Sequence, residues 1–329
     1  MTQIRIGMSG WTFPPWRCVF YPKGLPQKRE LEYASRMLNS IEINGTFYSL
    51  QQPSTYQAWY DATPDDFVFS VKGGQYITHI RRLRNVEEPL ASFMASGILG
   101  LKEKLGPILW QLPPNFVFDA ERLDAFFRLL PRDTKSAASL AKHHESRLSG
   151  RVLTTAEVDL PMRHAIEVRH PSFARPDFIE LLRKHNVALV IGDSGGKWPY
   201  AEDVTADFMY LRLHGAEELY ASGYTAEALD RWAERIQLWC AGKQPADAVH
   251  WSDRKPGKST SRDLFVYFDN TVKVKSPFDA MSLAYRIGPA ARGVDYLESG
   301  LAPPVPKLTK KALAERVSSR RKSVKKRDP

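Results

Sequence analysis

The chain has 329 residues, of which 43% are apolar and 26% are charged, and this composition excludes a fully disordered, collagen-like or low-complexity protein. Its two cysteines, Cys18 and Cys240, are too few for a disulfide scaffold or a cysteine-based metal site, and they fit a reducing compartment. No apolar run approaches the ~18 residues of a membrane span, and no apolar signal sequence precedes the strand-like segment at Ile4. We therefore expect a cytoplasmic protein with no membrane partner.

The net charge of +10 is concentrated at the C-terminal end of the chain. Residues 305–329 contain ten of the 47 basic and two of the 37 acidic residues, so residues 1–304 carry 37 basic residues against 35 acidic ones. We expect one domain over residues 1–300, followed by a basic tail, 301–329, that is disordered when free. Its basic residues, Lys307–Arg327, predict non-specific attraction of nucleic acid, and the body shows no such footprint.

Eight strand-like segments alternate with helical patterns along the chain. They are short, rich in β-branched or aromatic residues, and end in polar or glycine positions. The expected strands are Ile4–Gly7, Ser40–Asn44, Phe67–Lys72, Pro107–Leu112, His164–Val168, Val187–Ile191, Phe208–His214 and Leu264–Phe268.

Helical spacing of apolar residues follows nearly every strand, and only the connection after the sixth strand is less certain. The expected helices are Gln27–Leu38, Ser54–Ala62, Pro176–His185 and Pro277–Ile287, with further apolar stripes over Leu90–Leu101, Leu123–Leu130 and Leu229–Cys240. Eight βα units predict a single α/β domain folded as a closed (β/α)8 TIM barrel. A doubly wound sheet is the rival, but Gly7-Met8-Ser9-Gly10 lacks the glycine spacing of a dinucleotide-binding turn.

A polar insert of about residues 133–161 precedes the fifth strand. It contains Lys142-His143-His144-Glu145. We expect this run to lie on a solvated helix rather than to form a metal site.

In a barrel of this kind the site lies at the carboxyl ends of the strands. Residues alternate between the two faces of a strand, so the isoleucine, valine and leucine positions of the second, fifth and seventh strands must face the helices. Their polar neighbours then point into the barrel mouth: Glu42, Asn44, Glu167, Arg169, Arg212 and His214. A buried ion-pair network that only fills the barrel is the alternative, but burying ions gains little over apolar packing.

The remaining strand ends add further candidates for ligand binding. They are Trp11, Lys72, Gln111, His170 and Asn270. Trp11 opens an aromatic loop that either stacks on a sugar or base or packs on itself over the rim, and Trp11 is the residue nearest to the strand end. Arg169 and His170 either contact the ligand or support residues that do.

These segments resemble the YecE-like family, also called domain of unknown function seventy-two, in order over residues 4–288. The matching blocks are Ile6-Gly7-Met8-Ser9-Gly10-Trp11, Tyr21-Pro22, Glu42-Ile43-Asn44-Gly45-Thr46-Phe47-Tyr48, Phe69-Ser70-Val71-Lys72, Gln111-Leu112-Pro113-Pro114, Glu167-Val168-Arg169-His170-Pro171, Leu211-Arg212-Leu213-His214-Gly215 and Tyr267-Phe268-Asp269-Asn270. The resemblance implies a TIM barrel and assigns no reaction. It also implies a likeness in fold to the metal-dependent endonuclease IV barrels.

We favour an enzyme, a hydrolase or a lyase or isomerase, that acts on a small anionic or sugar-like substrate without cofactor or obligatory metal. Lys72 and Arg212 would hold the anionic group, Glu42 and Glu167 would act as acid and base, and His214 would shuttle a proton.

Two alternatives stay open. One is a metal-dependent nucleic-acid phosphodiesterase, which would draw its ligands from Glu42, Glu167, His170, Asp193, His214 and Asp269. Three cations in the same mouth, Lys72, Arg169 and Arg212, would repel its metal. The other is a non-catalytic protein that binds a small-molecule ligand in the barrel mouth.

Overall fold

Eight parallel strands close into a barrel in which each strand pairs with its neighbours in chain order, and β8 pairs with β1. The structure is a computed structural model that describes residues 2–215, 223–257, 259–270 and 274–288. The strands are β1 (Ile4–Ser9), β2 (Ser40–Ile43), β3 (Val68–Lys72), β4 (Leu105–Gln111), β5 (His164–Glu167), β6 (Val187–Asp193), β7 (Phe208–Leu213) and β8 (Asp263–Phe268). The expected TIM barrel is confirmed.

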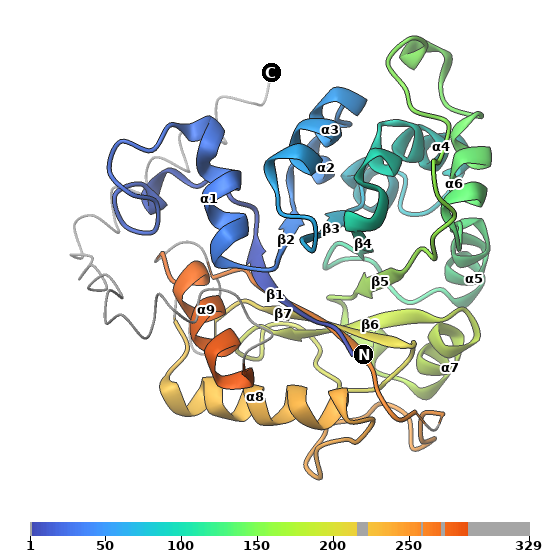
Figure 1. Cartoon of the computed structure of the whole chain (residues 1–329). Helices are drawn as coiled ribbons and strands as arrows, with labels where there is room; N and C mark the ends of the chain where they lie inside the picture. The colour runs from blue at the N-terminus through green and yellow to red at the C-terminus, as the bar shows by residue number, and fades with distance from the viewer. Residues whose placement is uncertain (1, 216–222, 258, 271–273, 289–329) are drawn as a thin grey trace.

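The helices lie outside the barrel, and α8 packs beside α9 (Figure 1). The α-helices are α1 (Glu30–Met37), α2 (Gly45–Tyr48), α3 (Pro53–Ala62), α4 (Glu87–Ala95), α5 (Ala120–Leu129), α6 (Thr134–Ala141), α7 (Pro176–Lys184), α8 (Ala226–Cys240) and α9 (Ser276–Ile287). The shorter turns are η1 (Pro14–Trp16), η2 (Gln27–Arg29), η3 (Tyr76–Ile80), η4 (Ile98–Lys104), η5 (Ser146–Leu148) and η6 (Pro171–Phe173).

Helix α8 illustrates how local sequence sets these elements. Thr225 caps its first turn by accepting a hydrogen bond from the backbone N–H of Ala228 at 3.2 Å. Leu229, Trp232 and Ile236 then recur at helical spacing and are buried in the main core. That core fills the space between the barrel and the helices.

Strand alternation separates this outer core from the barrel interior. Ile41 and Ile43 of β2 belong to the outer core, whereas Glu42 between them points inward. The base of the interior is apolar, and its cluster comprises Val68, Leu109, Ala165, Ala188, Val190, Phe208, Tyr210, Phe265 and Tyr267. The Tyr267 hydroxyl lies 2.7 Å from the hydroxyls of both Ser40 and Ser70. These three hydroxyls begin the polar part of the barrel interior above the apolar base.

The observed strands match the expected ones closely, and β1 and β6 extend two residues further, to Ser9 and Asp193. No helix occurs in the described residues 194–207, so the uncertain sixth connection is irregular. Three parts of the chain expected from sequence, namely residues 289–300 of the domain, the tail 301–329 and its basic run, lie outside the described residues. Within the described part, no helix combines the length and apolar character needed to cross a membrane.

The expectation of a solvated helix in the 133–161 insert is wrong in part. Helix α6 begins with a capping box between Asp133 and Ser136 and packs against α4. Ala137, Ala138 and Ala141 are buried, because small side chains let the two helices approach closely. The Lys142–Glu145 run follows the end of this helix instead of lying on it.

Candidate active site

Arg212 of β7 is the centre of a buried ionic cluster inside the barrel. Its guanidinium donates to Glu42 Oε2 and Oε1 at 3.0 and 2.9 Å, to Glu167 Oε2 at 2.6 Å and to Asp269 Oδ2 at 2.9 Å. Arg212 is fully buried. Burial opposes its charge, but the three carboxylates override burial and raise the pKa of Arg212 well above its usual range. One guanidinium therefore binds three acids from three different strand ends.

Glu42 has both carboxylate oxygens occupied. Besides the two bonds from Arg212, Oε1 accepts from Ser9 Oγ at 2.8 Å and Oε2 accepts from Tyr210 OH at 2.7 Å. Glu42 and Tyr210 have no exposed surface. Glu42 thus acts as a fixed acceptor below the cavity floor.

Glu167 joins the cluster to Arg169. Its Oε1 accepts from Arg169 Nε at 2.7 Å while its Oε2 accepts from Arg212. Burial raises the pKa of Glu167, but Arg169 and Arg212 outweigh burial and hold that pKa well below its ordinary value. The carboxylate therefore stays ionised, and both of its oxygens are held by guanidinium groups.

A cavity of about 570 Å³ opens above this cluster at the carboxyl ends of the strands. Its wall combines aromatic residues of the first loop and α2 with polar groups from several strands. The lining residues are Ser9, Gly10, Trp11, Thr12, Phe13, Trp16, Asn44, Phe47, Tyr48, Lys72, Gln75, His79, Gln111, Arg169 and Asp269. The volume is in the range of small-molecule sites.

Lys72 is a buried lysine in the cavity wall. It is 9% exposed, and its ammonium makes no hydrogen bond or ion pair with any described residue. Its Nζ lies 4.4 Å from the centre of the Phe47 ring. Burial, and next the charge of Arg212, lower the pKa of Lys72 to about 8.

The backbone around Lys72 fixes its position. Thr46 Oγ1 in α2 donates to the carbonyl oxygen of Lys72 at 2.7 Å, which places Phe47 beside the lysine side chain. The next residue is Gly73, where a Cβ atom would lie 2.3 Å from the Trp110 ring. Only glycine allows this approach, so β3 ends against Trp110 with Lys72 directed at the cavity.

Lys104 provides a contrast within the same chain. It is also buried, lies over an aromatic ring, and has a pKa lowered by burial. However, its ammonium donates to the carbonyl oxygens of Tyr60 and Thr63 at 2.7 and 2.8 Å. Lys104 thus binds backbone groups at the end of α3, whereas Lys72 has no such partner among the described residues.

Asp269, after β8, is the carboxylate that reaches the cavity. Its Oδ2 accepts from Arg212 and lies 3.4 Å from His214 Nδ1, and its side chain is 18% exposed. Burial opposes ionisation, but Arg212 and then His214 lower the pKa of Asp269 below its ordinary value. Asp269 is therefore an ionised group that a bound ligand can contact.

His79 and Gln75 reach the cavity from the segment after β3, near the π-helical turn η3. Burial, and next the charges of Lys72 and Arg169, lower the pKa of His79 to about 4. His79 is therefore neutral near neutral pH, and its Nδ1 lies 2.9 Å from Thr78 Oγ1. It offers a polar, uncharged contact on the cavity wall.

Five of the predicted ligand-binding residues line the cavity: Trp11, Asn44, Lys72, Gln111 and Arg169. Glu42, Glu167, Arg212 and His214 lie together below it. Asn270 is instead buried against α9, where it donates to Asp279 at 2.7 Å. His170 caps η6 by accepting from the backbone of Ser172 at 3.2 Å.

The aromatic loop supports both interpretations of its role. Trp16, Phe20 and Tyr21 are buried and pack edge to face or tilted against one another. Trp11 and Phe13 line the cavity. The loop therefore packs on itself and still supplies part of the ligand-facing wall.

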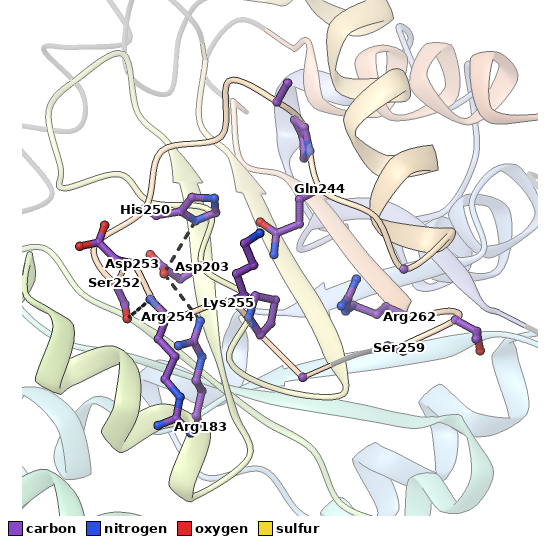
Figure 2. Close-up of a pocket in the computed structure, with 16 residues that line it drawn as sticks. Arg183, Asp203, Gln244, His250, Ser252, Asp253, Arg254, Lys255, Ser259 and Arg262 are labelled. Carbon is purple, nitrogen blue, oxygen red and sulfur yellow. Dashed lines mark hydrogen bonds and ion pairs between the residues drawn. The ribbon is translucent and has the colours of Figure 1, made fainter.

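A second cavity, of about 1190 Å³, lies at the opposite end of the barrel strands (Figure 2). We call it the basal cavity; its walls include Arg183, Asp203, His250, Arg254, Lys255 and Arg262. Arg183 and Arg254 pair with Glu180. Arg262 is 4% exposed and makes no side-chain hydrogen bond or ion pair with a described residue. It immediately precedes β8, so this cavity lies away from the end where barrel enzymes place their chemistry.

Metal-binding geometry is not evident in the described part of the chain. No group of three or more histidine, cysteine, aspartate or glutamate side chains is arranged there to hold a metal ion. The Glu42 and Glu167 oxygens already accept hydrogen bonds, mostly from guanidinium groups. They do not form an open ligand set.

The fold and the polar cavity define a TIM-barrel protein with a candidate site at the carboxyl ends of its strands. The chain belongs to the protein family of unknown function DUF72, whose model matches residues 5–307. The resemblance of the sequence blocks to the YecE-like family is thereby confirmed.

Relatives and solved structures agree with this membership. The UPF0759 protein YecE of Escherichia coli K12 is 31% identical over 253 residues, which cover 76% of this chain and 87% of that protein. YunF of Bacillus subtilis is 31% identical over 119 residues, 35% of this chain and 41% of that protein. The crystal structure of a DUF72 protein from Thermotoga maritima, TM1631, has a TM-score of 0.63 at 22% identity and covers 90% of this chain and 99% of that one. That likeness establishes the fold.

Proposed function

We propose that this protein is an enzyme that binds a small anionic substrate in the cavity at the carboxyl ends of the barrel strands. The observation that carries the proposal is the buried, cavity-lining ammonium of Lys72, which has no acidic partner among the described residues. A buried charge without a partner is costly, and an anionic ligand would supply that partner.

The ionic cluster below the cavity also supports an anionic substrate. Arg212 engages the carboxylates of Glu42, Glu167 and Asp269, so these acids do not neutralise Lys72 by direct contact. Arg169 adds a second cation to the wall, 4.9 Å from the Trp198 ring. The cavity thus presents two cationic side chains beside an aromatic wall.

Within this proposal the catalytic roles differ from those that the sequence suggests. Asp269 is the group we assign to proton transfer, because it reaches the cavity and its Oδ1 accepts no hydrogen bond from a described residue. Glu42, Glu167 and His214 become positioning residues around Arg212 and Asp269.

Metal-dependent phosphodiester hydrolysis has less support. Its metal would need the carboxylate oxygens that Arg212 now binds, and Arg212 cannot give up its charge at ordinary pH. The cations of the cavity wall add repulsion to a divalent ion.

Calorimetric titration with pyruvate, inorganic phosphate and glycerol phosphate tests the proposal. We expect one of these anions to bind the wild type, and we expect Lys72→Met to weaken binding by at least about tenfold. Lys135→Met is the matched control, because that exposed lysine pairs with Asp159 away from the cavity. Binding that is absent throughout, or equal in wild type and Lys72→Met, contradicts the proposal.

A further inference from the structure

Lys72 has the surroundings of a reactive amine as well as those of an anion holder. Lys72 lines the cavity, and its Nζ lies over the face of the Phe47 ring rather than against a carboxylate. The acids around it are engaged elsewhere, Glu42 and Asp269 by Arg212 and Glu167 by Arg169 and Arg212. No described group fixes this amine through a hydrogen bond.

We propose that Lys72 is a nucleophile that forms an imine with the carbonyl carbon of a 2-oxo acid. This inference rests on the proposed function, because it places the substrate in the same cavity. It goes further by naming the reacting atom and the substrate class.

Two features of the environment favour this chemistry over simple anion binding. Lysine becomes nucleophilic when it is desolvated or lies beside another cation, and both conditions hold at Lys72. Burial and Arg212 lower its pKa to about 8. About a tenth of the amine is then neutral at pH 7, far more than for a lysine with the ordinary pKa. A salt-bridged lysine would keep its proton.

The substrate class follows from the groups that share the cavity with Lys72. An amine of this kind attacks an aldehyde or ketone carbon. Arg169 lies on the same wall, and its guanidinium, which also holds Glu167 Oε1, matches the planar geometry of a carboxylate. A 2-oxo acid carries both functions on adjacent carbons, and the aromatic wall formed by Trp11, Phe13 and Phe47 would cover its side chain.

Asp269 transfers the protons during imine formation. The lone pair of the neutral Nζ adds to the carbonyl carbon and the C=O electron pair moves to oxygen. The Asp269 carboxylate takes the first proton from nitrogen and gives it to this oxygen, which forms a hydroxyl. It then takes the second proton from nitrogen and delivers it to the hydroxyl, which leaves as water while C=N forms. Amine and ketone give imine and water, and Asp269 is regenerated.

Reductive trapping tests the inference on the wild-type protein. Incubation with pyruvate and sodium borohydride would add hydride to the imine carbon and leave a stable secondary amine. Peptide mass analysis should place this adduct on Lys72, with Lys104 unmodified as the buried internal control. Acetone, which lacks the acid group, should label Lys72 at least about tenfold more slowly because it has no group for Arg169.

Lactate separates this inference from the proposed function, because it carries the acid but no carbonyl. Calorimetric binding of lactate without a Lys72 adduct from pyruvate would overturn the imine while the anion site stands. Neither binding nor adduct would overturn both. Labelling spread over surface lysines with Lys72 spared would also overturn the imine.

Discussion

Arg212 holds Glu42 by two parallel hydrogen bonds, from Nε to Oε2 at 3.0 Å and from Nη2 to Oε1 at 2.9 Å. Both residues have no exposed surface. This side-on pair from β7 and β2 forms the floor on which the cavity is built. Arg212 also pairs with Glu167 and Asp269, and Arg169 adds a second guanidinium at Glu167.

Replacing Arg212 should therefore destabilise the fold strongly. Arg212→Met leaves Glu42, Glu167 and Asp269 without their shared cation, and breaking a buried ion pair in this way costs about 3–5 kcal/mol. Chemical denaturation of wild type and variant measures the difference. A loss below about 1 kcal/mol would show that the cluster contributes little to folding.

Glu42→Gln tests whether Glu42 is a fixed acceptor. The four hydrogen bonds that Glu42 accepts come from donors on Ser9, Tyr210 and Arg212, so the glutamine NH2 group would face another donor. We expect a loss of about 1–3 kcal/mol in the free energy of unfolding. Glu121→Gln, on the exposed face of α5, is the control and should change little. Equal stability of the two variants would contradict the assigned role.

Lys72→Met should increase the free energy of unfolding at neutral pH, because it removes a buried ammonium that has no partner among the described residues. The folded-state pKa of about 8 lies below the ordinary lysine value of 10.5, so the folded protein binds fewer protons between these values. The free energy of unfolding of the wild type, relative to that of Lys72→Met, should consequently rise as the pH increases from about 8 to 10.5. A shift of this size corresponds to about 3 kcal/mol.

Unfolding free energies measured from neutral pH to beyond pH 10.5 check this sign. The charged groups named around Lys72, namely Arg212, Glu42, Glu167 and Asp269, remain in both proteins, so the difference isolates Lys72. A difference that stays constant with pH would mean that the pKa of Lys72 is unshifted.

Lys104→Met should destabilise the protein without affecting ligand binding. The ammonium satisfies the carbonyl oxygens of Tyr60 and Thr63, and leaving these buried acceptors unpaired costs about 1–3 kcal/mol. Thermal denaturation together with pyruvate titration measures both effects. A binding defect as large as that of Lys72→Met would remove the distinction between the two lysines.

Asp269→Asn should slow imine formation and leave affinity almost unchanged. The asparagine oxygen can still accept from Arg212, but the side chain no longer takes a proton from the attacking amine. The rate of borohydride-trapped adduct should fall by about 10²–10⁴-fold. An unchanged rate would exclude Asp269 from the proton transfer, and a large loss of lactate affinity would indicate a binding role instead.

Sequence periodicity predicts the meeting of Glu42, Glu167 and Arg212, because alternation in three strands turns them inward and barrel closure brings them together. Tyr210, two residues before Arg212, lies on the same face of β7 but is not among the predicted site residues. Alternation does not identify His79, which follows β3 in a π-helical turn with no strand periodicity. Nor does it show that Lys72 lacks an acidic partner, because that depends on which acids Arg212 engages in three dimensions.

The packing of the 133–161 insert is likewise not evident from its sequence. Its buried residues in α6 are the small side chains Ala137, Ala138 and Ala141, and the rest of the segment is largely polar. Their burial depends on α4 lying close by, a tertiary contact that local composition does not specify.

The ligand site that we propose lies at Lys72 and not in the basal cavity at Arg262. Calorimetric titration with pyruvate of wild type, Lys72→Met and Arg262→Met distinguishes the two locations. We predict that pyruvate binds wild type and Arg262→Met alike and that Lys72→Met loses at least about tenfold in affinity. Binding that survives in Lys72→Met and disappears in Arg262→Met would place the site at the other end of the barrel and rule out the site at Lys72.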